Sequence, residues 1–437
     1  MRSPSFTTLV AKEGRELMAS RAFWLLLLMI GPLVGQSFIT AVGHYAEASG
    51  INGGPAALPA ALTPLDGILV QTLGVYDLAA TLLLPFVAIR LIAAEKENGG
   101  IKLLLQLPGS LSAKVSAKAL VLFTGWLVSL LPAVLAMTLW KSYGGHLYAP
   151  ETVNLLLGHF VRAALSAAVA VAAAAIAESA ASAAIVTLGF TVGAWVLDFV
   201  ATGRGGWLQQ LAMYTPTVAL RNFEQGLLRV STLVVIAAFS IAGFALAVIW
   251  LHTGRTFINR CLASLTTIAV VAIVSLGGAS LRTSWDTSEN RRNSFSRADE
   301  AALRQVHAPL HITVFLAPED PRLTDLEQNV LKRLRRVLPR VDVDYAANSR
   351  SGLFESSADH YGEIWYEMGG QRAMDRSTIE QVVLEQVYKL AGIKTPEPDG
   401  DNAFSGYPLA ARPRWAGLIF YGLWPLVTLF IWWWMRR

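Results

Sequence analysis

Charged residues and cysteine are both scarce in this chain. Only 15% of its 437 residues are charged and 54% are hydrophobic, with a mean hydropathy of +0.45. Because a soluble protein carries about 25% charged residues, the composition indicates a membrane protein. The single cysteine, Cys261, excludes an internal disulfide framework and every Cys-x-x-Cys site. The net charge of +5 is small for this length, so we expect no nucleic-acid partner.

The common catalytic motifs are missing as well. The sequence contains no G-x-x-x-x-G-K-[ST], H-E-x-x-H or G-x-S-x-G motif. His307 and His311 are four positions apart, but Pro309 lies between them, and a helical metal site needs an unbroken turn. We therefore expect a non-catalytic protein without a metal site or a directly bound cofactor.

Eight apolar runs are long enough to cross a bilayer core, which takes about 20 helical residues. They predict an all-α polytopic membrane protein with about eight transmembrane helices. The first run lacks a small-residue cleavage site, so we expect it to be retained. The runs cover residues 22–42, 68–94, 119–140, 155–177, 181–201, 232–251, 262–281 and 415–435.

The first 21 residues have the pattern of an interfacial N-terminal helix. Phe6, Leu9 and Leu17 share one side of a helical wheel, which favours a helix lying in the membrane surface. Glu13 falls on that same apolar side and weakens the pattern. A frayed leader is the alternative interpretation.

The distribution of basic residues between the runs predicts the orientation. Lysine and arginine are concentrated in residues 1–21, 95–118 and 252–261, and are sparse in the other short connections. Because basic loops stay on the cytoplasmic side, we expect both termini to be cytoplasmic. Residues 43–66 and 282–412 would then be extracytoplasmic, in a protein of the cell (inner) membrane.

Residues 282–412 are expected to form a small α/β domain between the last two transmembrane helices. Two capping boxes, Thr324-x-x-Glu327 and Ser377-x-x-Glu380, predict helix starts. The predicted strands are 310–316, 341–345 and 364–367. The second helix is expected to turn Ile379, Val383, Val387 and Leu390 inward.

Residues 82–118 contain an unusual succession of breaks and charges. An apolar helix end is followed by charged residues, a Gly99-Gly100 break, a short apolar run and the stop Pro108-Gly109. This pattern predicts that a helix leaves the bilayer, breaks, forms a short surface helix and re-enters.

The same stretch resembles the permease subunits of type-2 ABC exporters, in the branch of the gliding-motility and nitrous-oxide-maturation permeases. Gly100 departs from the usual Thr, and Ala117 from the usual Gly. Downstream, Arg292, Ser294 and Ser296, with the strand at 312–315, resemble the auxiliary subunit of gliding-type ABC systems. The residues that match the permease pattern are Pro85, Ile89, Arg90, Glu95 to Glu97, Gly99, Leu103 to Leu105, Pro108 and Lys118.

The resemblance implies a domain organisation. Residues 22–251 would form a six-helix type-2 ABC permease core with a coupling helix at 95–110. A seventh transmembrane helix at 262–281, the extracytoplasmic auxiliary domain at 282–412 and an eighth helix at 415–435 would follow.

The resemblance also implies a function and partners. The chain would be the permease of an exporter, with no enzyme activity of its own. ATP and Mg would be bound by a separate ABC ATPase subunit, present in two copies. The permease would be a homodimer in the lipid bilayer, with an envelope protein as a further candidate partner. The expected ATPase-coupling residues are Glu95, Glu97, Ile101, Leu104, Leu105 and Pro108.

Four ionisable residues within the apolar runs are candidates for a translocation path or a dimer interface: Asp77, Arg90, His159 and Arg162. A charged group inside a bilayer is costly and tends to face a cavity or a partner. For the two arginines, snorkelling to the head groups is the alternative. Asp77, roughly 15 Å into its run, is the strongest candidate for a lining residue.

A rival function belongs to a different class. The chain could be an ATP-driven mechanotransmission or scaffold protein that moves its external domain without transport. A polar cavity between two copies would favour transport, and a sealed apolar seam would favour mechanotransmission. The sequence does not identify a substrate.

Overall fold

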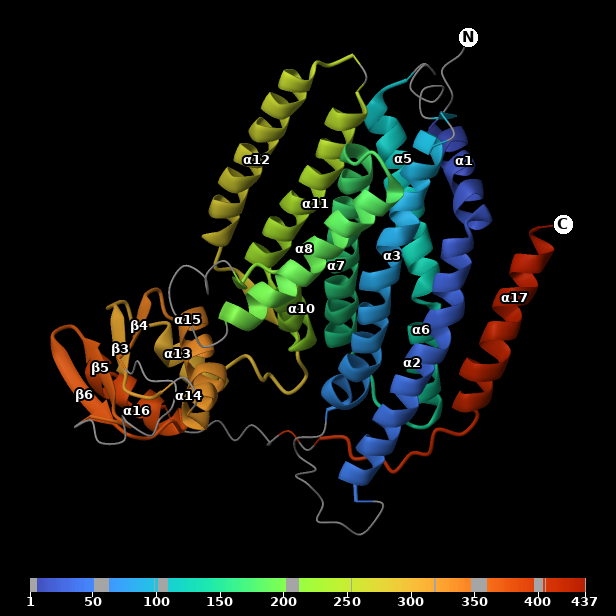
Figure 1. Cartoon of the computed structure of the whole chain (residues 1–437). Helices are drawn as coiled ribbons and strands as arrows, with labels where there is room; N and C mark the ends of the chain where they lie inside the picture. The colour runs from blue at the N-terminus through green and yellow to red at the C-terminus, as the bar shows by residue number, and fades with distance from the viewer. Residues whose placement is uncertain are drawn as a thin grey trace.

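A computed structural model describes residues 6–50, 63–97, 99–100, 109–201, 212–252, 254–317, 320–346, 360–396, 404 and 406–436. Within this part, seven helices are long and apolar enough to cross a membrane. An eighth apolar helix, Leu418–Trp434, is shorter. Each of the eight predicted runs coincides with one of these helices, so a mostly helical chain with a membrane-type bundle is confirmed (Figure 1).

The helices extend beyond the apolar runs at several ends, because helical hydrogen bonding continues into polar residues outside the apolar stretch. The first helix is α1 (Phe6–Ala19), so this segment is helical and not a frayed leader; its position in the membrane surface stays a prediction. The others are α2 (Arg21–Ala48), η2 (Leu65–Val70) with α3 (Gln71–Glu97), α5 (Leu111–Ser129), α6 (Leu131–Ser142), α7 (Ala149–Ile176), α8 (Ala180–Ala201), α10 (Pro216–Glu224), α11 (Val230–Leu251), α12 (Phe257–Ala279), and η4 (Leu418–Leu423) with α17 (Trp424–Trp434).

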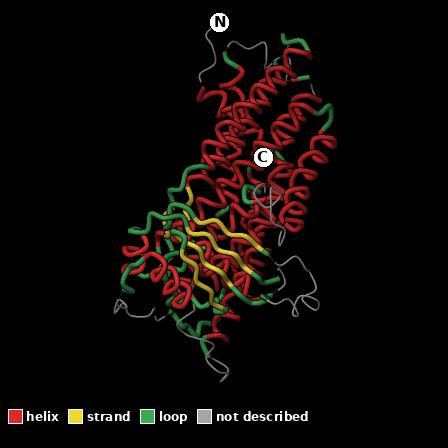
Figure 2. Tube along the Cα trace, turned by 90° about the vertical axis from the view of Figure 1, so that its left-hand side faces the viewer, coloured by secondary structure: helices red, strands yellow, loops and turns green. Residues whose placement is uncertain are grey.

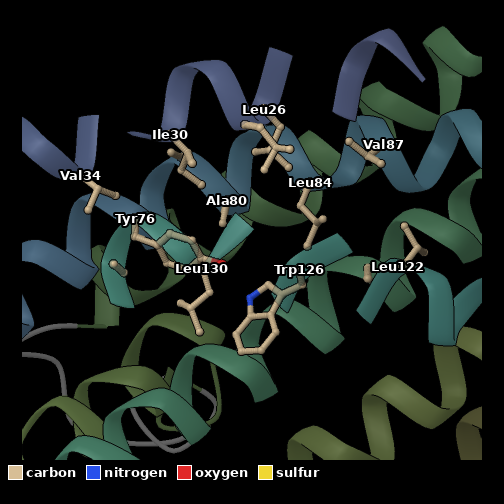
Figure 3. Packing of buried hydrophobic residues seen from close by; sticks show 14 of the residues in the cluster. Leu26, Ile30, Val34, Tyr76, Ala80, Leu84, Val87, Leu122, Trp126 and Leu130 are labelled. Carbon is tan, nitrogen blue, oxygen red and sulfur yellow. The ribbon is translucent and has the colours of Figure 1, made fainter. Parts of the chain in front are cut away.

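The centre of the bundle is an apolar core shared by α2, α3 and α5. Leu26, Ile30 and Val34 of α2 face side chains of α3 such as Leu84, and Trp126 of α5 closes the group (Figure 3). Lipid tails are as apolar as leucine, so close packing and polar links between helices must hold such a bundle together.

Small residues bring α7 and α11 unusually close. A Cβ atom on Gly243 of α11 would lie 2.8 Å from the carbonyl oxygen of Ala168 in α7. That space admits no side chain, so the two backbones lie in direct contact. By contrast, α8 and α12 leave large apolar side chains exposed, including Phe199 (83%) and Leu276 (75%). These faces are available to lipid or to another chain.

Residues 297–391 form a separate α/β unit around a four-stranded sheet of order β4-β3-β5-β6. The pair β3–β4 is parallel, whereas β3–β5 and β5–β6 are antiparallel. A helical crossover joins the parallel strands, as parallel pairing requires. The strands are β3 (Leu310–Val314), β4 (Val341–Tyr345), β5 (Ile364–Met368) and β6 (Gln371–Asp375). The helices are α13 (Arg297–Leu303), α14 (Pro321–Leu326), η3 (Glu327–Leu331), α15 (Lys332–Val337) and α16 (Glu380–Ala391).

The three predicted strands of this unit are confirmed, but both predicted caps are wrong. Asp320 caps the first helix, its Oδ1 accepting from the Arg322 amide at 2.9 Å, so the helix starts before Thr324. Helix α16 starts after Ser377, at Glu380, and Ile379 is 61% exposed instead of facing inward.

The α/β unit lies at one end of the helical bundle, with the strands gathered there (Figures 1 and 2). A short antiparallel pair, β1 (Leu227–Arg229) with β2 (Ser284–Asp286), forms the junction. The end of α2 and the start of η2 lie at this same end, while α1 and the connection from α11 to α12 lie at the other (Figure 1). This arrangement agrees with the relative sidedness expected from the basic residues; which end is cytoplasmic stays a prediction.

Candidate functional site

A partly buried cluster of opposite charges joins α1, α3 and α5. It consists of Lys12, Glu13 and Glu16 of α1, Glu95 of α3 and Lys118 of α5, and we call it the α1 cluster. The Lys118 Nζ lies 2.6 Å from a Glu13 carboxylate oxygen and 3.0 Å from one of Glu95. Lys12 forms ion pairs with Glu95 and, at 3.0 Å, with Glu16.

The α1 cluster explains why Glu13 stands on the apolar side of α1. Its side chain is 2% exposed and meets Lys118, which is 3% exposed. A buried charge is tolerated only with a partner, so α1 is held against the bundle by this contact. Burial raises the pKa of Glu13, and the Lys118 ammonium opposes that rise.

The carboxylates of Glu13, Glu16 and Glu95 lie close enough together to suggest a metal site. The ammonium groups of Lys12 and Lys118, however, already bind these carboxylates. The arrangement is therefore that of an ion-pair network, whose charges are largely balanced without a metal.

Lys96 fastens the end of α3 to α7. Its Nζ donates to the carbonyl oxygens of Ala174, Ala175 and Ala177 at 2.8, 2.7 and 2.8 Å. These carbonyls lie at the C-terminal end of α7, where the last carbonyl groups of a helix receive no hydrogen bond from the helix itself. A cation there also complements the negative end of the helix dipole. The charged residues Glu95 and Lys96 thus join α3 to three other helices.

Most of the predicted coupling helix falls outside the described residues. This holds for Ile101, Leu104, Leu105 and Pro108, and for the side chain of Glu97. Its flanks are described: Gly99 has a φ of +69°, a conformation that favours glycine, and Ser110 caps α5 by accepting from the Ala113 amide at 3.2 Å.

Glu95 is buried by contacts within this chain, and its contact with an ATPase stays a prediction. The residue is 8% exposed, and its described ion pairs are made with Lys12 and Lys118 inside this chain. The described contacts of Glu95 thus join α3 to α1 and α5.

A second charged group lies inside the bundle, and we call it the intramembrane cluster. Asp77 of α3 meets Arg162 of α7 at 3.0 Å and His159 of α7 at 3.6 Å. Arg162 also donates to the Thr81 hydroxyl at 3.3 Å and to the Pro216 carbonyl oxygen at 3.4 Å. The structure thus brings together three of the four predicted intramembrane residues.

A small pocket adjoins the intramembrane cluster, lined by polar groups of α3 and α7 and by Trp126 of α5. His159 is 1% exposed, and neither of its ring nitrogens has a hydrogen-bond partner within the described residues. Its ring packs edge-on against Tyr76, with centroids 6.2 Å apart. These groups contact one another within one chain, and their role in a translocation path or a dimer interface stays a prediction.

Arg90 stands apart from both clusters. Its side chain is exposed on α3, and the described partners of Glu95 are lysines. A long basic side chain near a helix end, exposed in this way, has the position needed for snorkelling to lipid head groups.

A third group of polar contacts ties the α/β unit to the bundle, and we call it the junction. Arg292 reaches Asp66 at 2.6 Å and donates to the Thr63 hydroxyl at 3.1 Å. Glu289 meets His146 at 3.0 Å and accepts from the Tyr407 hydroxyl at 2.6 Å. The segments near residues 63 and 146 are thereby linked to residues 282–296, which precede the α/β unit and which we call its stem.

Asp286 holds the junction loop in shape. Its carboxylate accepts from the Asn293 amide at 2.9 Å and from the hydroxyls of Ser288 and Ser294 at 2.5 and 2.8 Å. The resemblance alone selected Ser294 and Arg292 from the sequence, and the acidic residues Asp286 and Glu289 were not predicted. The run Asp-Thr-Ser-Glu-Asn after the seventh apolar run was a signal for such a hydrogen-bonded loop.

Comparisons with protein-family models, with curated proteins and with solved structures gave no match.

Proposed function

We propose that this chain is the transmembrane permease subunit of an ABC-type exporter. It would couple ATP hydrolysis by a separate ATPase subunit to the translocation or extrusion of a substrate. The observation that carries the proposal is the anchoring of the connection between α3 and α5. Glu95 and Lys96 lie just before it and Lys118 after it, and all three are fixed to other helices.

Such anchoring is what a force-bearing connection needs. A push on residues 101–108 would act on α3 and α5 through the chain itself. The α1 cluster would carry it to α1, and Lys96 would carry it to α7. Coupling needs contiguous packed groups, and these charged contacts supply them at the base of the segment.

The remaining parts of the proposal rest on the resemblance and on the expected orientation. Two permease copies and two ATPase subunits would form the unit, with ATP and Mg bound by the ATPase. The shorter helix Leu418–Trp434 would be the eighth span, and the α/β unit would be extracytoplasmic. The exposed apolar faces of α8 and α12 offer surface for lipid or for the second copy.

The junction favours mechanotransmission as the alternative function. Asp66 lies at the start of the helix that ends with Glu95 and Lys96, and it binds Arg292 of the stem. A movement of this helix would therefore reach the α/β unit directly. A polar path between two copies would favour transport over this alternative.

Copurification with the ATPase tests the proposal. Leu104→Ala with Leu105→Ala removes two predicted anchors, and truncating a buried leucine costs about 2–5 kcal/mol where packing is core-like. We expect the ATPase to dissociate or to lose coupling, while the permease still inserts. Glu97→Ala should do much less if, as we expect, its carboxylate meets the ATPase at a solvent-exposed rim, because ion pairs in such places contribute about 1 kcal/mol or below.

Leu418→Ala with Leu423→Ala is the matched control, since both leucines are exposed on η4, away from the predicted coupling segment and from the faces of α8 and α12. Normal recovery of the ATPase together with normal hydrolysis in the Leu104 and Leu105 variant would overturn the coupling assignment.

A further inference from the structure

An apolar groove runs between α2 and α17 on the outside of the bundle. Leu25 and Leu28 of α2 form one wall, and Leu429 and Trp432 of α17 form the other. The groove has a volume of about 210 Å³ and ends at two arginines, Arg21 and Arg436. It lies outside the three polar groups described above.

The groove ends where the two helices pack closely against each other, further from the α1 end. A Cβ on Gly31 would lie 2.0 Å from the Trp424 ring, and one on Gly35 would lie 2.3 Å from Phe420. Aromatic rings of η4 and α17 therefore pack against the glycine positions of α2, and the helices touch there. Toward the α1 end, residues 21–30 of α2 contain no glycine, and the larger side chains there line the groove.

The chemistry of the groove is divided along its length. Its wall is apolar, and the hydroxyl of Thr428 is turned to the Trp424 carbonyl oxygen of its own helix, at 2.8 Å. At the mouth, the Arg436 guanidinium lies 4.4 Å from the centroid of the Trp432 ring, which holds the charge in place. None of the described residues that line the groove is acidic.

We propose that this groove binds an anionic phospholipid. One acyl chain would lie between the leucines of the two walls, and the phosphate would meet Arg21 and Arg436. Guanidinium groups bind phosphate through paired hydrogen bonds, and basic pockets between membrane helices bind lipid head groups. The volume is below the roughly 300–1,000 Å³ of pockets for drug-sized ligands, and suits a stretch of a single chain. This site does not depend on ABC transport.

Native mass spectrometry of the full-length protein in detergent tests the site. The delipidated protein is titrated with phosphatidylglycerol and with phosphatidylcholine of the same acyl chains. We expect the anionic lipid to bind more tightly. Arg21→Gln with Arg436→Gln should weaken it at least about tenfold, because each basic group near a head group contributes appreciably. Arg15→Gln with Arg255→Gln removes the same charge from exposed positions at the same end and should change little.

A second variant tests the apolar part without touching the arginines. Leu28→Trp should fill the groove and reduce phosphatidylglycerol binding, whatever the folding of the arginine variant. Equal binding of the two lipids, or unchanged binding in Leu28→Trp, would overturn the proposal. A third outcome would also overturn the proposal: phosphatidylglycerol binding that is unaffected by Leu28→Trp but is displaced by millimolar inorganic phosphate. That result would indicate a site for the free anion.

Discussion

The two ends of the helical bundle are held together by different chemistry. At the α1 end, lysines meet carboxylates in the interior, and Lys118 and Glu13 are only 3% and 2% exposed. At the end that carries the α/β unit, the contacts are more open: Arg292 is 22% exposed and its partner Asp66 is 53% exposed.

This difference sets how firmly each end is held. Removing one partner of a buried ion pair leaves an uncompensated charge and costs about 3–5 kcal/mol. An exposed pair contributes about 1 kcal/mol or less. The α1 end should therefore move as one unit, whereas the contact between Arg292 and Asp66 at the other end can open at small cost. In the proposed function, the ATPase would push on the α1 end, and the resulting movement would reach the α/β unit at the other end.

The largest effect is expected from Lys118→Met. The change removes the ammonium that lies between Glu13 and Glu95 and leaves two carboxylates buried. We expect the free energy of unfolding to fall by about 3–5 kcal/mol in a denaturant titration in mixed micelles. Adding Glu13→Gln should restore part of the loss, because it removes one of the two buried carboxylates that would then share the single ammonium of Lys12.

Lys141→Met is the control for that experiment. Lys141 is exposed at the end of α6, so its loss should change stability by about 0.5 kcal/mol or less. An equal effect of Lys118→Met and Lys141→Met would remove the distinction between the two ends.

The positions of the membrane helices could be predicted because lipid requires long apolar runs in sequence. Their ends could not, since polar residues continue the helix: α7 begins at Ala149 and includes Glu151, both before the predicted start. Strand β6 was missed although Gly369 and Gly370, with φ of 56° and 83°, form the two-residue turn typical of a hairpin.

The sequence identified individual residues of the candidate sites but not the contacts between them. Asp77, His159 and Arg162 were selected because charges are rare in lipid, but their association depends on how α3 packs on α7. The burial of Glu13 had no local signal, because its partner Lys118 lies 105 positions away. Such pairings are set by tertiary contact and not by spacing along the chain.

Lys96→Met should have the next largest effect. It removes three hydrogen bonds to the end of α7 and leaves buried carbonyls without that donor, at a cost of about 1–3 kcal/mol. We expect faster hydrogen exchange of the amides of residues 173–177, with little change in α12. Unchanged exchange in that turn would show that α3 and α7 are joined by apolar packing alone.

At the other end, Arg292→Ala should cost about 1 kcal/mol or less, because the pair with Asp66 is partly exposed. We expect more rapid proteolysis of the stem at 282–296 with the helical bundle unaffected. Asp66→Asn should have a similar effect, and the double variant should add little, since the two residues share one contact. Full additivity, or unfolding of the bundle, would contradict a yielding junction.

The smallest effect concerns pH and Tyr407. Its hydrogen bond to Glu289, at 2.6 Å, raises the pKa of Tyr407 to about 12, above the value of about 10 for an unfolded tyrosine. The folded state keeps the proton to higher pH, so this stabilisation is complete below about pH 10 and is lost as the pH rises toward 12. Tyr407→Phe should thus lower the melting temperature at pH 8, and the difference from the unsubstituted protein should shrink at pH 11. In a protein that already carries Glu289→Gln, the effect of Tyr407→Phe on the melting temperature should depend much less on pH. A difference that stays constant from pH 8 to 11 would show that Tyr407 holds the junction by packing and not through its hydroxyl.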